Sequence, residues 1–296
     1  MKMDLVYNPV AGSFRAERLD RLVEAFAAHG FAVQPMATTA AGAVLSGEAD
    51  LVCVHGGDGT LRDTVQALMQ KTGEDAGATP LCLAPAGTIN LVARELGYAR
   101  DPGALARQIA ASCARGSEGW VHSPLYALGE TPIVSCLSIG PDSHAVAGVS
   151  PALKKRIGRY AYGAAMMKQL RRWPRAPMPI NGELADGSLF ETQAEAAIVS
   201  HGALYGGPFR LSRLAALQAD SVELITMRQS TRTGTAALMT AAMLGRQVEG
   251  MRGIEIRTCR RISFADCVAP VQVDGDHMPE CAHTIEPTGI SLRYCV

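Results

Sequence analysis

Short apolar runs and amphipathic helices alternate along the N-terminal part of the chain. Helical spacing is clearest at Leu19, Leu22, Val23 and Phe26, which recur at i, i+3, i+4 and i+7 before a stop at Gly30. The pattern predicts a strand at 5–7, this helix, a strand at 31–36, a short helix at 40–46 and a strand at 51–54. Strands that alternate with helices predict a parallel, doubly wound α/β sheet, with ligands at the carboxyl ends of its strands.

The pattern changes near residue 121. Short strand-like runs separated by turn residues follow at 121–128, 133–139, 189–199, 222–227, 254–257 and 271–273. Helical segments interrupt them at 151–175 and 235–244, and the second of these reads as core packing. We therefore predict an α/β domain over residues 1–120, completed by a last strand within 288–296, and a β-rich domain over residues 121–287.

A loop with three glycines, Gly56, Gly57 and Gly59, joins the strand at 51–54 to a helix that starts near Thr60. Glycines let backbone N–H groups turn towards a bound group, and a helix N-terminus adds positive potential, so the loop suits a phosphate. Asp58 would repel a phosphate unless a divalent cation or its bound water lay between them. The alternative is a plain glycine-rich turn before a helix.

The run Gly56-Gly57-Asp58-Gly59-Thr60 resembles the signature loop of the diacylglycerol kinase catalytic family, which includes sphingosine kinases and bacterial lipid kinases. NAD kinases and phosphofructokinases share a related loop. The segment Pro85-Ala86-Gly87-Thr88-Ile89-Asn90 is similar to the Pro-x-Gly-Thr-x-Asn element of the lipid kinases and favours that branch. The resemblance implies a doubly wound nucleotide-binding domain followed by a β-sandwich-like domain, with ATP and Mg²⁺ as cofactors.

The same resemblance implies which residues bind the nucleotide. The two loops would hold phosphates, with Asp58 organising the metal, directly or through water. Asn8-Pro9-x-x-Gly12 resembles an opening element that lines the ATP site in these kinases, and Thr38 matches a threonine that contacts the nucleotide. Taken alone, Asn8-Pro9 would be a surface turn.

Resemblance also assigns two residues to the acceptor side of the reaction. Val273-Asp274-Gly275-Asp276 resembles the late Val-Asp-Gly-Glu element, which makes Asp276 the candidate proton acceptor, one methylene shorter than the usual glutamate. Gly140-Pro141-Asp142 falls where lipid kinases have a Gly-x-Asp segment, so Asp142 is a candidate for orienting the substrate hydroxyl. The alternatives are a type I′ hairpin turn at Asp274-Gly275 and a type I turn at Gly140-Pro141-Asp142.

Three positions depart from the family pattern. The run Gly202-Ala203-Leu204-Tyr205-Gly206-Gly207 resembles the Asn-Gly-x-Tyr-x-Gly-Gly turn of the family, with His201 where asparagine is usual. A surface-loop histidine is the simplest interpretation of His201, and a proton carrier is the alternative. An acidic element that holds a structural magnesium in some bacterial members is reduced here to Asp220 and Glu223, so we expect that auxiliary metal to be weak or absent. Arg62 replaces a common asparagine and could contact a phosphate or disturb the site.

Composition sets the limits of these hypotheses. Lys+Arg and Asp+Glu balance at 28 each, so no global basic field suggests nucleic acid as a partner. The eight cysteines include no Cys-x-x-Cys pair, which indicates reduced thiols in a cytoplasm. We expect neither a signal peptide nor a transmembrane segment, so membrane contact would be peripheral, at the inner face. The sequence is compatible with a homodimer.

One local charge patch stands out in this neutral chain. Residues 151–175 carry eight basic side chains and no acidic one, which suits docking on anionic lipid headgroups. The alternative is a solvated helix face, because Leu153, Ile157, Ala161 and Ala164 also form an inward stripe.

The leading hypothesis is an ATP- and Mg²⁺-dependent kinase that phosphorylates a hydroxyl of a diacylglycerol-like or other long-chain lipid. The alternatives are an NAD kinase-like enzyme with a soluble substrate, and a nucleotide- or lipid-binding regulator that has lost turnover.

Overall fold

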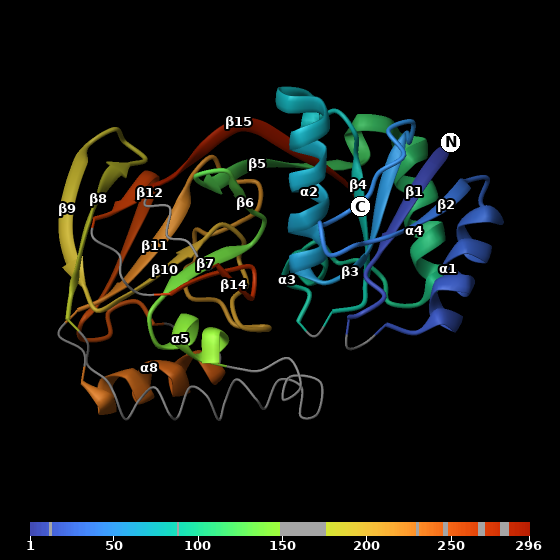
Figure 1. The fold of residues 1–296 in the computed structure, drawn as a ribbon. Helices are drawn as coiled ribbons and strands as arrows, with labels where there is room; N and C mark the ends of the chain where they lie inside the picture. Colours follow the sequence, from blue (N-terminus) through green and yellow to red (C-terminus); the bar gives the residue numbers. More distant parts are fainter. Residues whose placement is uncertain are drawn as a thin grey trace. The chain divides into compact units, whose positions relative to one another are not determined.

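The chain forms two compact units in the computed structural model (Figure 1). Unit 1 comprises Met1–Leu125 and Thr288–Val296, and unit 2 comprises Tyr126–Pro287. The structure describes residues 1–11, 14–87, 89–148, 176–228, 231–244, 248–265, 270–278 and 284–296. The predicted site residues Gly12 and Thr88 and the basic segment 151–175 lie outside the described residues.

Unit 1 is built on a parallel sheet. Its strands are β1 (Lys2–Tyr7), β2 (Ala32–Ala37), β3 (Leu51–Gly56) and β4 (Leu81–Pro85), with the end of β15 (Thr284–Cys295) beside β4. The order across the sheet is β15-β4-β3-β1-β2, and β1 pairs in parallel with both β2 and β3. The connections after β1 and β3 therefore run in opposite directions, which makes the gap between these two strands the topological switch point.

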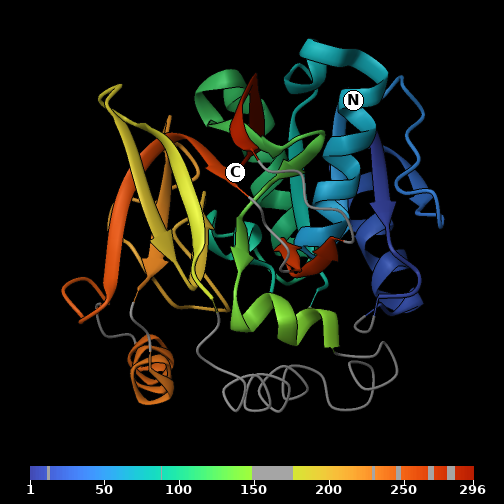
Figure 2. The ribbon, with the colours of Figure 1, turned by 60° about the vertical axis from the view of Figure 1, so that its left-hand side comes forward.

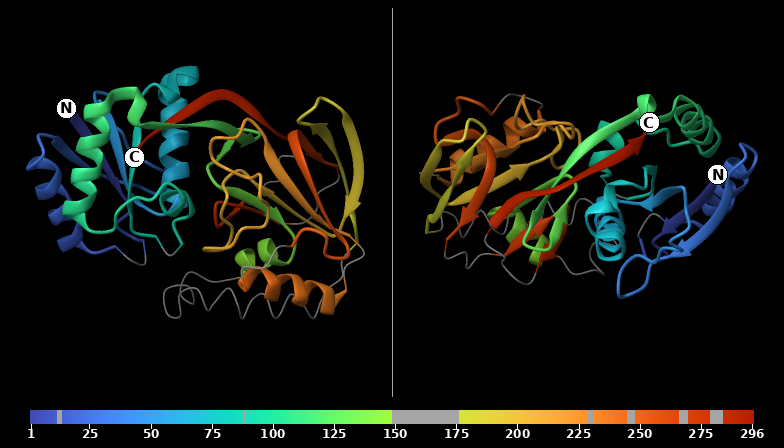
Figure 3. Two further views of the ribbon diagram at one scale, coloured as in Figure 1. Left: turned by 180° about the vertical axis from the view of Figure 1, so that it is seen from behind. Right: turned by 90° about the horizontal axis from the view of Figure 1, so that it is seen from above.

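Helices cover both faces of this sheet. They are α1 (Ala16–Ala27), α2 (Asp58–Thr72), α3 (Leu91–Glu95) and α4 (Pro102–Arg115), with short 3₁₀ turns η1 (Gly73–Gly77) and η2 (Gly116–Gly119). Helices α1 and α4 pack side by side on one face, and α2 lies on the other (Figure 3). Leu22 and Phe26 of α1 are buried as their spacing predicted, and the Phe26 ring meets Phe31 edge-on.

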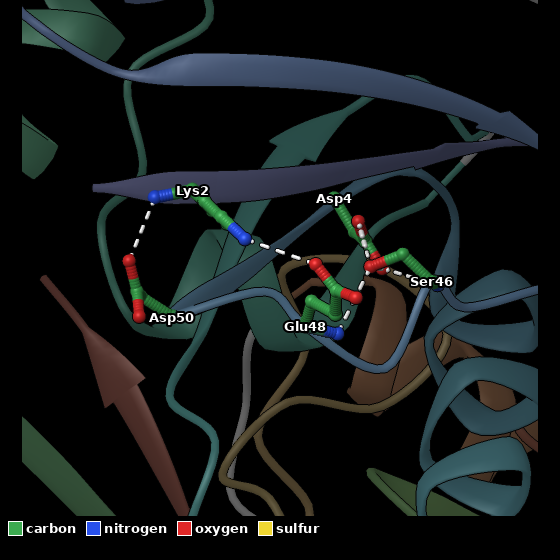
Figure 4. Close-up of polar contacts among 5 residues, drawn as sticks. All are labelled: Lys2, Asp4, Ser46, Glu48 and Asp50. Atoms are coloured by element: carbon green, nitrogen blue, oxygen red, sulfur yellow. Dashed lines mark hydrogen bonds and ion pairs between the residues drawn. The ribbon is translucent and has the colours of Figure 1, made fainter.

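The helix predicted at 40–46 is wrong, because this segment is irregular. Gly42 has φ +115°, a value outside the helical region. The buried Asp4 carboxylate accepts the Ser46 N–H at 2.8 Å. The Lys2 ammonium donates to the Glu48 carboxylate, and the Lys2 backbone N–H donates to the Asp50 carboxylate (Figure 4). These contacts hold Ser46 and the residues that follow it beside β1, and so short a helix would have little intrinsic stability with which to compete.

Unit 2 is mainly antiparallel. Its strands and helices are β5 (Trp120–Leu128, which begins in unit 1), β6 (Thr131–Ile133), β7 (Cys136–Ile139), α5 (Pro141–Gly148), β8 (Met178–Leu184), β9 (Leu189–Ala194), β10 (Ala196–Ser200), β11 (Val222–Met227), α8 (Arg232–Met243), β12 (Ile254–Phe264), β13 (Val271–Val273) and β14 (Asp276–Met278). The main order is β14-β13-β7-β10-β11-β12-β15, and the hairpin of β8 and β9 pairs with β12 (Figure 2).

The core of unit 2 is formed by buried side chains of its strands. Its members include Tyr126, Leu137, Val199, Leu224 and Phe264, all fully buried. A second cluster joins Leu238 of α8 to Ile225 of β11, which confirms that this predicted helix packs inward. The predicted fold class, a doubly wound α/β unit followed by a β-rich unit, is confirmed. None of the described helices combines the length and the apolar character that a membrane span requires.

We predict that Tyr98→Phe weakens the attachment of the last strand. The buried Tyr98 hydroxyl donates to the Cys295 carbonyl at 2.7 Å, and its loss leaves a buried acceptor without that partner. We expect the free energy of unfolding to fall by about 1–2 kcal/mol, measured by urea denaturation. A change below about 0.3 kcal/mol would show that the bond contributes nothing net.

Candidate active site

Four parallel strands of unit 1 end at one edge of the sheet. Tyr7 pairs with Ala37 and with His55, and Gly56 pairs with Pro85, so the four carboxyl ends are in register. The loops that follow carry the predicted nucleotide-binding residues. They meet at the topological switch point, where open α/β sheets bind ligands.

The two glycine-containing loops are joined by backbone hydrogen bonds. The Gly56 carbonyl accepts the N–H groups of Ala86 at 2.9 Å and Gly87 at 3.1 Å. The loops also pack backbone against backbone, because a Cβ added to Gly87 would lie 2.5 Å from the Gly57 Cα. Only glycine fits at position 87, whereas a Cβ at position 57 would make a tight contact, 3.2 Å from the Gly87 Cα.

Asn90 shapes the second loop from within. Its side chain accepts the Gly87 N–H at 2.7 Å and donates to the Gly87 carbonyl at 2.8 Å. Its own backbone is left-handed, with φ +55°, which asparagine tolerates better than most residues. Asn90 therefore closes the second loop through hydrogen bonds to both backbone groups of Gly87.

Asp58 connects the first loop to helix α3. Its carboxylate accepts the N–H groups of Leu91 at 2.8 Å and Val92 at 3.1 Å, the first two residues of that helix. These N–H groups have no acceptor within the helix. The negative charge of the Asp58 carboxylate is also favourable at the N-terminus of α3, which carries positive potential. Asp58 thus holds the two loops in one arrangement, and its predicted role at a metal remains a hypothesis.

The other predicted nucleotide-binding residues of unit 1 follow the same edge. Asn8 forms an Asx turn, since its side chain accepts the Val10 N–H at 3.0 Å, and the Thr38 N–H donates to the Tyr7 carbonyl. Pro9 is exposed beside Asn8. Gly59 and the buried Thr60 open helix α2 directly after Asp58.

His55 precedes the first loop and is a residue that sequence reasoning missed. Its side chain is 1% exposed, and its Nδ1 lies 3.0 Å from the Ala84 carbonyl, while Nε2 has no hydrogen-bond partner. Burial lowers the pKa of His55; the hydrogen bond to Ala84 acts against this shift, and the positive charge of Arg18 adds to it. His55 is thus held neutral beneath the loops.

A cavity of about 290 Å³ opens beside the second loop. Pro85 and Asn90 line it together with two basic residues, Arg94 and Arg100. On the neighbouring side, the Arg18 guanidinium donates to the Arg100 carbonyl at 2.6 Å. The surroundings of the second loop are therefore cationic.

Arg62, which replaces an asparagine common in the family, lies on α2. Its side chain is buried and pairs with Asp63 at 3.1 Å. The structure thus places Arg62 within unit 1, at an intramolecular ion pair.

Asp276 starts strand β14 in unit 2, directly after a two-residue hairpin turn. Val273 pairs with Asp276, and the turn residues Asp274 and Gly275 have φ +52° and +89°. Positive φ at both positions confirms the type I′ turn that their sequence indicated. The turn presents Asp276 at a fixed end of the hairpin.

Asp274 is a second residue whose importance the sequence did not reveal. Its side chain is 7% exposed, and its carboxylate accepts the N–H groups of Val134, Ser135 and Cys136 at 2.8–3.1 Å, together with the Ser135 hydroxyl at 2.8 Å. Four donors thus satisfy a buried charge, as burial requires. Asp274 fixes the hairpin to the segment that enters β7.

Asp142 lies in the first turn of helix α5, so the alternative of a type I turn is replaced by a helix. Tyr205 donates its hydroxyl hydrogen to the Asp142 carboxylate. Tyr205 belongs to the turn 202–207, which resembles a family element, and the structure thereby brings together two motifs that are distant in sequence. Helix α5 packs against β13 and β14, the hairpin that carries Asp276.

The interpretation of His201 as a surface residue is wrong. Its side chain is only 1% exposed and its ring lies 5.8 Å from that of Tyr126. The His201 N–H donates to the Ser135 carbonyl, so backbone pairing draws this turn into the core.

The remnant of the acidic element is split between surface and interior. Asp220 is exposed, whereas Glu223 is buried and accepts the Ser212 hydroxyl hydrogen at 3.0 Å. Within the described parts of the chain, no three His, Cys, Asp or Glu side chains converge as metal ligands. A metal at Asp220 therefore stays a prediction from resemblance.

Comparison with known families agrees with this architecture. Residues 2–118 match the diacylglycerol kinase catalytic domain, and residues 135–293 match the YegS C-terminal NAD kinase beta sandwich-like domain. The two family matches define a kinase with an α/β unit and a β-sandwich unit. The chain belongs to the diacylglycerol kinase catalytic-domain family, which confirms the resemblance of its loops.

Solved structures share the fold across almost the whole chain. A crystal structure of a diacylglycerol kinase from Bacillus anthracis str. Sterne is 20% identical, with a TM-score of 0.68 and coverage of 98% of this chain and 96% of the other. Two further structures from this bacterium are 19% and 20% identical, with TM-scores of 0.71 and 0.69, covering 98% and 99% of this chain and 94% and 97% of theirs. At such identities the likeness shows the fold alone. No curated protein matches the sequence.

We predict that Asp58→Asn destabilises unit 1. Asparagine keeps one acceptor oxygen and turns an NH₂ group towards the second of the two N–H donors of α3. We expect the free energy of unfolding to fall by about 1–3 kcal/mol, measured by urea denaturation. Asp101→Asn is the matched control, because Asp101 caps α4 through one N–H only and asparagine caps equally well. Equal losses in both variants would contradict the double-acceptor role of Asp58.

We also predict that His55 makes unit 1 sensitive to acid. Its pKa in the folded chain lies below the ordinary value of 6.5, so protonation favours the unfolded chain. Its contribution is fully present above about pH 6.5 and is lost as the pH falls through the folded pKa. Urea midpoints of wild type and His55→Gln, measured between about pH 8 and pH 5, should fall more steeply in the wild type. Parallel curves would contradict a buried neutral histidine.

Proposed function

We propose that this chain is an ATP- and Mg²⁺-dependent lipid kinase. It transfers the γ-phosphate of ATP to a hydroxyl of a diacylglycerol-like or other long-chain lipid, as a cytoplasmic protein at the inner face of the membrane. Membership of the diacylglycerol kinase catalytic-domain family supports phosphoryl transfer to a lipid alcohol.

The joined loops of unit 1 are the observation that carries the proposal. Gly56, Gly57 and Gly87 bring two strand–loop–helix junctions into backbone contact at the carboxyl ends of β3 and β4, beside the switch point of a parallel sheet. Such junctions offer backbone N–H groups and positive helix ends to phosphates. In the proposal these loops hold the triphosphate, with Gly59, Thr60, Thr88 and Asn90, while Asn8, Pro9, Gly12 and Thr38 line the nucleotide.

The donor set of unit 1 suits a magnesium ion held through water. Magnesium prefers oxygen ligands, keeps several of its waters, and binds through one or two carboxylates together with phosphates. Asp58 supplies such a carboxylate, fixed beside both loops by its bonds to α3. A bound Mg²⁺ would neutralise charge on the phosphates.

Unit 2 supplies the groups that the proposal assigns to the acceptor. Asp276 would accept the proton of the lipid hydroxyl, and Asp142 would orient that hydroxyl. Both lie on elements held by packing and hydrogen bonds. Asp276 follows the turn that Asp274 fixes to Ser135, and the Asp142 carboxylate accepts a hydrogen bond from the Tyr205 hydroxyl. Precise placement is the main demand that phosphoryl transfer makes of a protein, because the protein does little covalent chemistry itself.

Peripheral membrane attachment is the last part of the proposal. The eight basic residues of 151–175 would dock on anionic lipid headgroups and bring the chain to its substrate. Near a membrane surface each such residue contributes about 1 kcal/mol of attraction.

The test measures transfer of γ-labelled phosphate from ATP into a total bacterial lipid extract, in mixed micelles with Mg²⁺. We expect the label in one lipid species with wild type, and a rate lower by about 10²–10⁴-fold with Asp276→Asn, which removes the proton acceptor. Asp276→Glu, which restores the side-chain length of the family, should retain turnover.

Asp186→Asn is the matched control for this test. Asp186 is an exposed carboxylate in the turn between β8 and β9, bonded to Ser188, and its loss should leave the rate unchanged. Thermal shift with ATP reports nucleotide binding separately. Absence of label from every lipid, with ATP binding intact, would contradict a lipid kinase and favour a regulator or a soluble acceptor.

A further inference from the structure

A line of hydrogen bonds runs through unit 2 from the hairpin of Asp276 to Asp142. At one end, the Gly275 N–H donates to the side-chain oxygen of Gln272. The Gln272 NH₂ group donates to the Ser138 hydroxyl at 3.0 Å. Gln272 and Ser138 are directly opposed on the antiparallel strands β13 and β7, so their side chains share one face of the sheet.

The line continues through Tyr205. Ser138 lies close enough to the Tyr205 hydroxyl for a side-chain hydrogen bond that acts to lower the pKa of Tyr205, and Tyr205 itself donates to the Asp142 carboxylate. Burial, and then the charge of Asp142, raise the pKa of Tyr205 well above its usual value, so the phenol keeps the proton that it donates. The Gly275, Gln272 and Tyr205 donors all point along the line towards Asp142.

The middle of the line is buried. Ser138 is fully buried and Gln272 is 4% exposed. Buried polar side chains are costly unless they are satisfied, and a satisfied chain of hydrogen bonds fixes the orientation of each member and strengthens its neighbours. An apolar core would hold β7, β13 and the 202–207 turn together without this cost. A polar line at this place therefore indicates a need for exact orientation at its two ends.

We propose that Tyr205, Ser138 and Gln272 are positioning residues that set the Asp142 carboxylate and the Asp276 hairpin in one fixed arrangement for the acceptor hydroxyl. This inference rests on the proposed function, because it assigns both ends of the line to the acceptor. In this proposal none of the three residues touches the substrate. They act through Asp142, and through the backbone of Gly275, which directly precedes Asp276.

The first test compares Tyr205→Phe with Tyr126→Phe in the phosphate-transfer assay. Tyr126 is the matched control, because it is a buried tyrosine of the same unit whose hydroxyl donates to the Asp220 carbonyl, outside the line. We expect Tyr205→Phe to lower kcat at least tenfold while KM for ATP stays within about twofold, since misplacement of a catalytic group costs mainly rate. Similar kcat values for the two variants would overturn the proposal, and so would a fall in kcat that merely follows the unfolding temperature.

The second test uses paired substitutions in the same assay. Ser138→Ala and Gln272→Leu cut the line at different points. If the residues act as one unit, the double variant should be no slower than the slower single variant. Multiplying losses would mean that each residue acts separately and would overturn a common line.

A third readout separates this inference from the proposed function. Asp142 and Gln272 are linked through Ser138 and Tyr205, so Asp142→Asn and Gln272→Leu should be coupled in unfolding: the double variant should lose less in urea midpoint than the sum of the two single losses. Coupling in a chain that phosphorylates no lipid would refute the proposed function and leave the line standing. Additive midpoints together with normal kinase activity would overturn the line alone.

Discussion

The contact between Gly57 and Gly87 is the constraint on which the candidate nucleotide site depends. Two loops from separate strand–helix junctions meet there with no side chain between them. The carbonyl of Gly56 then reaches two N–H groups of the second loop, and the Asp58 carboxylate reaches the first turn of α3. A methyl group at the contact would force the loops apart and disturb all of these bonds together. The sheet brings the loops to one edge, and the glycines let them act as one structure.

A buried carboxylate has the corresponding part in unit 2. Asp274 accepts three backbone N–H groups from the segment entering β7, and its left-handed backbone lets β13 turn directly into β14. One residue thus sets both the course of the hairpin and its attachment to the neighbouring strand. Asp58 and Asp274 use the same chemistry, since each carboxylate binds backbone donors of another segment and thereby fixes the position of its own loop.

Periodicity and turn chemistry predicted much of the fold. The spacing in α1, the glycine loops after β3 and β4, and the Asp274-Gly275 turn each depend on neighbouring residues, which a sequence displays directly. The wrong predictions concern residues whose hydrogen-bond partners are distant in the sequence. Ser46, at the end of the segment 40–46, is held by Asp4 on β1, and the backbone of His201 is paired with Ser135. Apolar patterning cannot reveal such pairings, because their polar residues would suit a surface equally well.

The candidate site shows the same division. The loop sequences identified which residues gather at the edge of unit 1, but the actual work of Asn90 and Asp58 there is hydrogen bonding to backbone, which their motif does not specify. In unit 2, Asp142 and Tyr205 were recognised in separate motifs, and only the folded chain joins them. A motif records which residues are present; their hydrogen-bond partners come from topology.

The shorter side chain at Asp276 can be understood from the hairpin that carries it. A glutamate has one more rotatable bond and can adjust to a less exact backbone, at a cost in side-chain entropy. An aspartate follows its backbone closely, so its reach depends on where the hairpin lies. Here Asp274 fixes that hairpin on one side and Gln272 on the other, through Gly275. A tightly held backbone is therefore compatible with a short carboxylate at Asp276. The rigidity of the turn replaces the conformational adaptability of the longer glutamate side chain.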